Sequence, residues 1–199
     1  PGAQILVAKN GDVIYNKSFG NKIYESSDKV KWDDLYDLAS LTKILSTIPL
    51  IMNEYELDNI NLETTLSDML PNIDLKDKEN ISIKEMLSHQ AGLFPWIPFY
   101  KKTIDSLTNK PLSNWYKSSK RDGFTIKVTD NLFLKDVFLD TINLNIINSD
   151  LSDDKSYVYS DLPYYFIKSF LENKNNNDLD FQLKQKLLLG LGANKTTYN

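Results

Sequence analysis

The chain begins with two short apolar runs on either side of a turn signal. The runs lie in AQILVAKNGDVIYNKSFG, residues 3–20, and are rich in residue types that favour β-strands. The pair Asn10-Gly11 between them readily supplies the positive φ angles of a tight turn. This pattern predicts a β-hairpin at the start of the chain.

The most apolar segment follows, from Ser40 to about Leu57. Its large side chains recur at helical spacing, at Ile44, Leu45, Ile48, Ile51, Met52 and Tyr55. The apolar stripe is broad, which predicts a largely buried helix. Because proline lacks an N–H group and its ring crowds the preceding turn, we expect a kink or a local widening at Pro49.

Two shorter helices are marked by their ends. The first is predicted from about Thr64 to Leu70 and ends at Pro71, which cannot continue the hydrogen-bond pattern. The second begins at Ser82, since Glu85 three residues later completes a capping box, and it stops near Gly92.

The second half of the chain alternates polar and apolar stretches. Residues 105–123 are polar, and we interpret them as an excursion from the core. A helical or mixed segment around 133–142 follows. SYVYSDLPYYFIKSFLEN, residues 156–173, predicts a short strand, a turn and a helix with Asp161 as its N-cap. Residues 184–199 end a helix and enter a loop.

Composition narrows the classes of function. The 199 residues are 41% hydrophobic and 25% charged, with a formal net charge of −4, which is typical of soluble globular proteins and argues against nucleic acid as the main partner. Cysteine is absent and His89 is the one histidine, so we expect neither a metal site nor a cofactor. No signal-peptide pattern is visible, and ILSTIPLIM is far shorter than the about 20 residues that span a bilayer.

The motif S-x-x-K occurs three times, with Ser26, Ser40 and Ser152 as its serines. Only Ser40 precedes an apolar helix, where it and Lys43 lie one turn apart on the same face. Serine becomes a nucleophile when a base takes its proton, and lysine is such a base where burial or a neighbouring cation lowers its pKa. The alternative is that Ser40 is only a helix cap and Lys43 faces solvent.

Tyr159 is the second candidate. Among eleven tyrosines it alone is followed two places later by Asn or Asp, in Tyr159-Ser160-Asp161. A phenol that faces the serine relays its proton if a cation lowers the phenol pKa from about 10. Asp161 either holds the lysine or caps the helix. The alternative for Tyr159 is a half-buried strand residue.

Four blocks in this order resemble the serine β-lactamase-like superfamily: LYDLASLTKILSTIPLIM, ISIKEMLSHQAGL, YVYSDLPYYFIKSFLE and LLLGLGANKTTYN. The branch they look most like contains class C β-lactamases, penicillin-binding D,D-peptidases and esterases. The resemblance implies an α/β (α+β) fold, with a helical subdomain beside an antiparallel sheet. It also implies that Ser40 is acylated, that Lys43 serves in proton transfer and that Tyr159 is a general base or proton relay. Asp161 stands where Asn is more usual in the family.

The resemblance extends to the block HQAGL and the residues after it. His89 is expected to support the turn by hydrogen bonding, and Gly92 to permit it. The aromatic residues that follow either line a substrate cleft or pack under the loop: Trp96, Phe99 and Tyr100. The run GLFPWIPFY resembles modules fused behind a family 3 glycoside hydrolase domain of the β-N-acetylglucosaminidase type. This subgroup implies an extracytoplasmic location, in the periplasm or cell envelope.

One family motif is not found after Tyr159. The superfamily carries K-T-G or H-x-G on a strand that supplies one oxyanion-hole N–H, and NKTTYN lacks the glycine. We therefore expect residues 1–199 to be the N-terminal portion of a single β-lactamase-like domain whose last strands lie elsewhere. Loss of one oxyanion donor costs about 10²–10³ in rate, so the portion alone is expected to be weak or inactive.

Three hypotheses of function follow. The first is a serine hydrolase that forms an acyl-enzyme with an ester or amide, from a cell-wall peptide, a β-lactam or another small molecule. The second is a catalytically silent binding or scaffold module attached to the glycoside hydrolase. The third places function on the polar excursion of residues 105–123.

Overall fold

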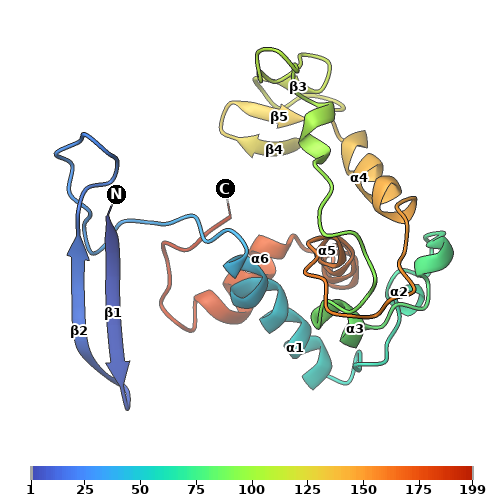
Figure 1. Ribbon diagram of the computed structural model, residues 1–199, viewed down its shortest axis with the longest axis horizontal. Helices are drawn as coiled ribbons and strands as arrows, with labels where there is room; N and C mark the ends of the chain where they lie inside the picture. Colours follow the sequence, from blue (N-terminus) through green and yellow to red (C-terminus); the bar gives the residue numbers. More distant parts are fainter. Residues whose placement is uncertain (1, 199) are drawn as a thin grey trace. The chain divides into compact units, whose positions relative to one another are not determined.

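The computed structural model describes residues 2–198. It divides into two compact units, one that ends at Ala39 and one that begins at Ser40. In the first unit β1 (Ala3–Lys9) and β2 (Asp12–Phe19) form an antiparallel hairpin (Figure 1). Asn10 and Gly11 have φ angles of 53° and 90°. The predicted hairpin and its turn are thus confirmed.

The second unit is mainly helical and contains a small antiparallel sheet (Figure 1). In chain order its elements are η1 (Lys43–Thr47), α1 (Ile48–Glu56), α2 (Leu66–Met69), η2 (Lys76–Lys78), α3 (Ile83–Leu87), η3 (Phe99–Lys102), β3 (Tyr116–Lys117), β4 (Ile126–Thr129), β5 (Leu132–Leu134), α4 (Val137–Ile147), α5 (Leu162–Asn175), α6 (Leu179–Leu183) and η4 (Lys184–Leu188). The strand order of the sheet is β3-β5-β4.

The core of this unit is built around α5. Its buried side chains recur at helical spacing and include Leu162, Phe166, Ile167 and Leu171. They face η1, α3, α4 and α6, which all contact α5. The burial of this face stabilises the unit and fixes the N-terminal end of α5, which follows Asp161 directly.

Capping residues set the ends of the short helices. Ser82 and Glu85 form the predicted capping box at α3, with each side chain bonded to the backbone N–H of the other. A second capping box, between Thr65 and Asp68, starts α2. Each box satisfies N–H groups that the first helical turn leaves without partners.

The helix that follows Ser40 differs from its prediction in burial. Leu50 and Ile51 are buried, but Ile44 is 58% exposed and Met52 is 63% exposed. Apolar side chains of α1 instead line an open groove of about 750 Å³. The prediction of a largely buried helix is wrong, because helical spacing shows which face is apolar and not whether a neighbour covers it. The expected widening is confirmed, since η1 is a π-helical stretch just before Pro49.

The strand predicted before α5 is also wrong. The segment that carries Tyr159 belongs to no strand or sheet among the described residues. Its backbone partner is a turn and not a strand: the Val158 N–H donates to the carbonyl oxygen of His89, 2.9 Å away. A ladder requires repeated pairing with an extended neighbour, which a turn does not offer.

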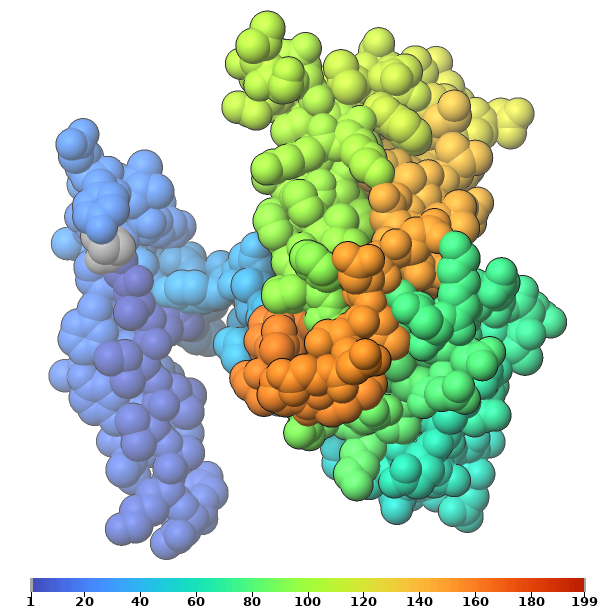
Figure 2. Space-filling view, turned by 45° about the vertical axis from the view of Figure 1, so that its right-hand side comes forward, coloured from blue at the N-terminus to red at the C-terminus, as the bar shows by residue number. Residues whose placement is uncertain are grey.

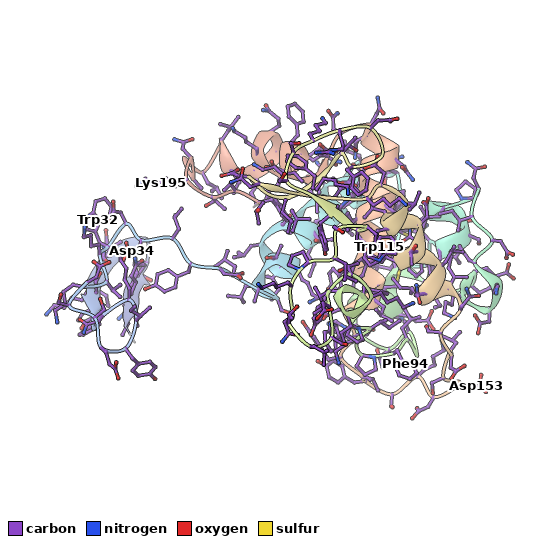
Figure 3. All side chains as sticks on the ribbon, turned by 90° about the horizontal axis from the view of Figure 1, so that it is seen from above. Trp32, Asp34, Phe94, Trp115, Asp153 and Lys195 are labelled. Carbon is purple, nitrogen blue, oxygen red and sulfur yellow. The ribbon has the colours of Figure 1, made fainter. Side chains whose placement is uncertain are left out.

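The polar excursion of residues 105–123 is folded. It contains β3, and its Trp115 side chain, labelled in Figure 3, packs edge-on against Phe138 of α4. The centres of the two rings are 5.2 Å apart. The excursion is therefore anchored to α4 and to the sheet. Among the described helices, none has the length and apolar character needed to cross a membrane.

Candidate active site

Ser40 and Lys43 lie side by side at the start of the helical segment. The chain reaches Ser40 through Ala39, whose φ of 43° is unusual for a residue with a Cβ atom. The Lys43 N–H donates to the Ser40 carbonyl oxygen across 3.1 Å, which closes the first turn. The Lys43 ammonium nitrogen then lies 3.0 Å from the Ser40 hydroxyl oxygen. The structure thus brings together the serine and the lysine of this S-x-x-K match.

Lys43 also reaches the segment that carries Tyr159. Its Nζ atom forms an ion pair with Oδ1 of Asp161 across 2.6 Å, although 118 positions separate the two residues in sequence. The same nitrogen lies 5.1 Å from the centre of the Tyr159 ring and 5.3 Å from that of Tyr164. Lys43 is therefore the point at which the two predicted parts of the site meet. Of the two roles considered for Asp161, its side chain holds the lysine and makes no helix-capping bond.

The block around HQAGLFP holds this segment in place. The Ser160 N–H donates to Nδ1 of His89 across 3.2 Å, and the Asp161 N–H donates to the carbonyl oxygen of Pro95 across 2.9 Å. The Ser160 hydroxyl, which is buried, donates to the carbonyl oxygen of Phe94. Figure 2 shows the segment before α5, in orange, against this green block. Residues on both sides of Tyr159 are thus fixed by backbone hydrogen bonds.

Gly92 allows the block to turn toward the segment. Its φ is +74°, and an added Cβ would lie 2.3 Å from the carbonyl oxygen of Ser152. The Ser152 N–H donates to the Gly92 carbonyl oxygen across 2.9 Å. No residue with a side chain fits at this position without displacing the backbone. The backbones of Gly92 and Ser152 therefore approach each other closely, which requires glycine at position 92.

The pKa shifts separate the roles of the lysine and the tyrosine. Burial acts to lower the pKa of Lys43, but hydrogen bonds to Asp161 and Tyr159 outweigh it and the pKa is raised. The pKa of Tyr159 is lowered, first by its hydrogen bond with Lys43 and then by that with Ser40. Lys43 is therefore held as a cation, which is unsuited to accept a proton. Of the two groups, the Tyr159 phenol is the one whose pKa is lowered.

The other two S-x-x-K matches do not form such a pair. The Ser26 hydroxyl oxygen accepts the N–H of Asp28, and that of Ser152 accepts the N–H of Asp154. Lys155 instead pairs with Glu85 across 3.3 Å. Both serines have the local bonding of turn residues.

The three aromatic candidates divide between the two roles considered for them. Phe99 is buried and packs edge-on against Tyr165, with ring centres 5.4 Å apart. Trp96 and Tyr100 are exposed and lie with their ring centres 6.4 Å apart. Phe94, which the sequence reasoning did not select, is exposed as well. Two of the predicted residues thus offer aromatic surface, and Phe99 packs beneath the loop.

Two further residues of the site were missed by the sequence reasoning: Ser160 and Tyr164. Ser160 lies within Tyr159-Ser160-Asp161, so this motif already pointed to its position in the site. Tyr164 lies one turn into α5, where its ring faces Lys43, and burial raises its pKa. Among residues 2–198 no group of His, Asp or Glu side chains is arranged to hold a metal ion.

A comparison with known families matches residues 1–118 to the family described as Beta-lactamase. The chain belongs to the β-lactamase family. The matched part of this β-lactamase-family chain includes Ser40, Lys43, His89 and Gly92, and it ends before Tyr159. The family predicted from the sequence blocks is confirmed at this level.

Two relatives are longer than this chain. The N-acetylmuramyl-L-alanine amidase of Bacillus subtilis (strain 168) is 28% identical over 212 residues, which cover 100% of this chain and 43% of the amidase. Protein flp of Staphylococcus aureus (strain MRSA252) is 32% identical over 113 residues, which cover 55% of this chain and 22% of flp. The chain spans less than half the length of either relative.

Solved structures share the fold. A β-lactamase/D-alanine carboxypeptidase from Yersinia pestis has a TM-score of 0.69 at 19% identity, over 98% of this chain and 49% of that one. An octameric penicillin-binding protein homologue from Pyrococcus abyssi has a TM-score of 0.69 at 20% identity, over 96% of this chain and 39% of that one. The predicted fold class, β-lactamase/transpeptidase-like with helices and antiparallel sheets, is confirmed.

Proposed function

We propose that this chain is the N-terminal part of a serine hydrolase, with Ser40 as its nucleophile. The observation that carries the proposal is the position of Lys43, whose ammonium group contacts the Ser40 hydroxyl at 3.0 Å and the Asp161 carboxylate at 2.6 Å. This cation lowers the pKa of Tyr159, which makes the phenolate available as a base at lower pH. A serine, a tuned base and a group that orients both form the arrangement that nucleophilic catalysis requires.

The reaction proceeds in two steps through an acyl-enzyme. The Tyr159 phenolate takes the proton of the Ser40 hydroxyl while the serine oxygen attacks the carbonyl carbon of an ester or amide. Tyr159 then gives that proton to the departing alcohol or amine, and the acyl group remains on Ser40. A water molecule then attacks the acyl-enzyme while Tyr159 takes its proton, and Tyr159 returns that proton to the Ser40 oxygen as the acid leaves. Lys43 stays protonated throughout and stabilises the phenolate.

For the substrate class we propose an amide of the bacterial cell wall. The Bacillus subtilis relative is named an N-acetylmuramyl-L-alanine amidase, and the Yersinia pestis structure is named a β-lactamase/D-alanine carboxypeptidase. Each name describes an enzyme that breaks an amide bond. Peptidoglycan peptides and β-lactams are therefore the first substrates to test, and a location in the cell envelope fits both.

A covalent probe tests the proposal. A fluorophosphonate that reacts with activated serines is expected to add one adduct to the protein, seen in the intact mass. Ser40→Ala removes the adduct, whereas Ser26→Ala, which alters another S-x-x-K serine, leaves it unchanged. The probe is applied to the 199-residue chain and to the longer polypeptide that carries the remaining family motif. A folded longer polypeptide that takes up no probe overturns the proposal.

The alternative is a silent scaffold module attached to a β-N-acetylglucosaminidase-type glycoside hydrolase. The observation behind it is the run GLFPWIPFY, residues 92–100, which resembles modules of that kind. This alternative predicts that Ser40→Ala and Tyr159→Phe leave glycosidase activity and ligand affinity of the parent protein unchanged. The reading frame upstream of Pro1 shows whether such a domain is encoded.

A further inference from the structure

His89 contacts the ring of Tyr159 and the residues before and after it in the chain. Its carbonyl oxygen accepts the N–H of Val158 across 2.9 Å, and its Nδ1 atom accepts the N–H of Ser160 across 3.2 Å. Its ring lies against the Tyr159 ring, with centres 4.5 Å apart. One residue thus fixes the backbone before and after Tyr159 and also the face of its phenol.

The bond from Ser160 specifies the protonation state of His89. An imidazole nitrogen accepts an N–H only when it carries no proton, so Nδ1 must be bare and the ring neutral. Burial and, next, the positive charge of Lys43 lower the pKa of His89, which favours this neutral form. Protonation would set an N–H on Nδ1 against the N–H of Ser160 and add a second cation near Lys43.

The groups that face the imidazole come from three parts of the unit. Lys43 belongs to η1, and Tyr164 lies on α5 with its ring centre 6.1 Å from that of His89. Tyr157, Tyr159 and Asp161 belong to the segment before α5. Asp161 favours the protonated imidazole and Lys43 opposes it, and the two are already bonded to each other. The ion pair leaves burial as the dominant influence on His89.

We propose that His89 is a positioning residue of the hydrolase, which holds the Tyr159 phenol at Ser40 only while its imidazole is neutral. This inference rests on the proposed function of Ser40 and Tyr159. It goes beyond support of a turn, because it gives the side chain a protonation-dependent effect on the base. Acid then switches off acylation by displacing Tyr159, in addition to protonating it.

Substitution of His89 by asparagine separates two properties of the side chain: its acceptance of a hydrogen bond and its titration. His89 has a φ of 57°, a conformation that asparagine tolerates better than most residues. The Oδ1 atom of asparagine lies about where Nδ1 of histidine lies and accepts a hydrogen bond at every pH. His89→Asn therefore keeps the turn and the acceptor and removes only the titration. His89→Ala removes the acceptor as well.

The sequence makes the bond directly observable by NMR. Tyr159-Ser160 is the only Tyr-Ser dipeptide in the chain, so carbonyl-¹³C tyrosine with ¹⁵N serine gives a single amide signal in an HNCO spectrum. His89 is the only histidine, so its ring gives one titration curve. The Ser160 amide is expected to shift with the same midpoint as the His89 ring, below the ordinary histidine pKa of about 6.5. A Ser160 amide that does not follow the His89 titration overturns the proposal.

The pH dependence of labelling provides the functional readout. In the unmodified protein, the rate of fluorophosphonate labelling of Ser40 is expected to fall at acid pH with the midpoint of the His89 titration. In His89→Asn this fall is expected to disappear. The labelling rate of His89→Ala is expected to be reduced at every pH. An unchanged acidic limb in His89→Asn contradicts the proposal. If Ser40 takes up no label at any pH while Ser160 follows His89, the hydrolase function fails and the positioning by His89 stands.

Discussion

Lys43 and Asp161 are joined by an ion pair of 2.6 Å across 118 positions of sequence. The pair links the helix that follows Ser40 to the start of α5, and it places the lysine ammonium between a serine and a tyrosine. Because the carboxylate raises the pKa of Lys43, the lysine serves this site as a fixed cation. The proposed role of Tyr159 as the base rests on this relationship.

Replacing Asp161 separates its charge from its hydrogen bond. Asp161→Asn keeps an oxygen that accepts from Lys43, so we expect the labelling rate of Ser40 to stay within about tenfold of the unmodified protein, a change of at most about 1.4 kcal/mol in activation free energy. Asp161→Ala removes the acceptor and is expected to be slower than Asp161→Asn. The second-order rate constants of fluorophosphonate labelling check this order. A slower Asp161→Asn would show that the carboxylate charge, and not the placement of Lys43, is what matters.

Removing the phenol oxygen of Tyr159 is expected to abolish most of the reaction. Tyr159→Phe takes away the proton acceptor, and general-base catalysis contributes about 10²–10⁴ in rate. The matched control is Tyr157→Phe, since Tyr157 also lies against His89 but not near Lys43. Its labelling rate is expected to be unchanged.

The pH dependence of labelling follows from the lowered pKa of Tyr159. A base acts in its deprotonated form, so the rate is expected to rise with pH until the phenol is ionised. Since hydrogen bonds with Lys43 and Ser40 lower this pKa, the rise ends below the ordinary tyrosine value of about 10. A rate that still climbs above pH 10 would argue against the contact with Lys43.

Adding a methyl group at Gly92 is expected to destabilise the second unit. The φ of +74° costs a residue with a Cβ atom about 1–2 kcal/mol. The Cβ would also lie 2.3 Å from the Ser152 carbonyl oxygen, and such overpacking adds about 1–3 kcal/mol. Gly123→Ala is the control, because Gly123 has the same φ and no atom within 4 Å of the added Cβ. Urea unfolding followed by circular dichroism should show the larger loss for Gly92→Ala.

The carboxylate of Glu54, near the C-terminal end of α1, is expected to stabilise the fold. The side chain is 1% exposed and accepts hydrogen bonds from Asn59, Asn175 and Lys186. Glu54→Ala removes one acceptor from each of these three donors, and such a loss at a buried site costs about 1–3 kcal/mol. Glu56→Ala, on the exposed face of the same helix, is expected to change the free energy of unfolding by at most about 0.5 kcal/mol.

Acid should weaken the fold through Glu54. Burial acts to raise the pKa of Glu54, but its hydrogen-bond donors outweigh burial and lower it. A carboxylate whose pKa is lowered on folding stabilises the protein above its unfolded pKa, and this contribution is lost as the pH falls through the folded pKa. The free energy of unfolding, measured from pH 7 down to pH 3, should therefore fall less steeply in Glu54→Gln than in the unmodified protein. Equal slopes would contradict the shift.

Local sequence signals predicted the parts of the fold that local chemistry determines. Asn10-Gly11 specified its hairpin, and Ser82 with Glu85 specified the start of α3, since these residues satisfy nearby backbone groups wherever the chain lies. The exposure of α1 had no such signal, because burial depends on neighbours that are distant in sequence. The missing strand before α5 has the same cause: the partner of Val158 is the turn at His89.

The sequence selected the candidate residues of the site. It did not predict their pKa shifts or the bonds between distant segments. Composition and spacing selected Ser40, Lys43 and Tyr159, but the direction of the Lys43 pKa shift depends on Asp161, which only the folded chain brings within 2.6 Å. The hydrogen bond from Ser160 to His89 is likewise a product of the fold. Charges and bonds between distant segments therefore require the structure.

The most direct test is to identify the residue that the fluorophosphonate modifies. The protein is labelled, digested and analysed by tandem mass spectrometry, with no substitution that alters the fold. We predict that the adduct is found on Ser40, and that Ser26 and Ser152 of the other two S-x-x-K matches are unmodified. An adduct on either of those serines, or none on Ser40 in the folded protein, would contradict the account.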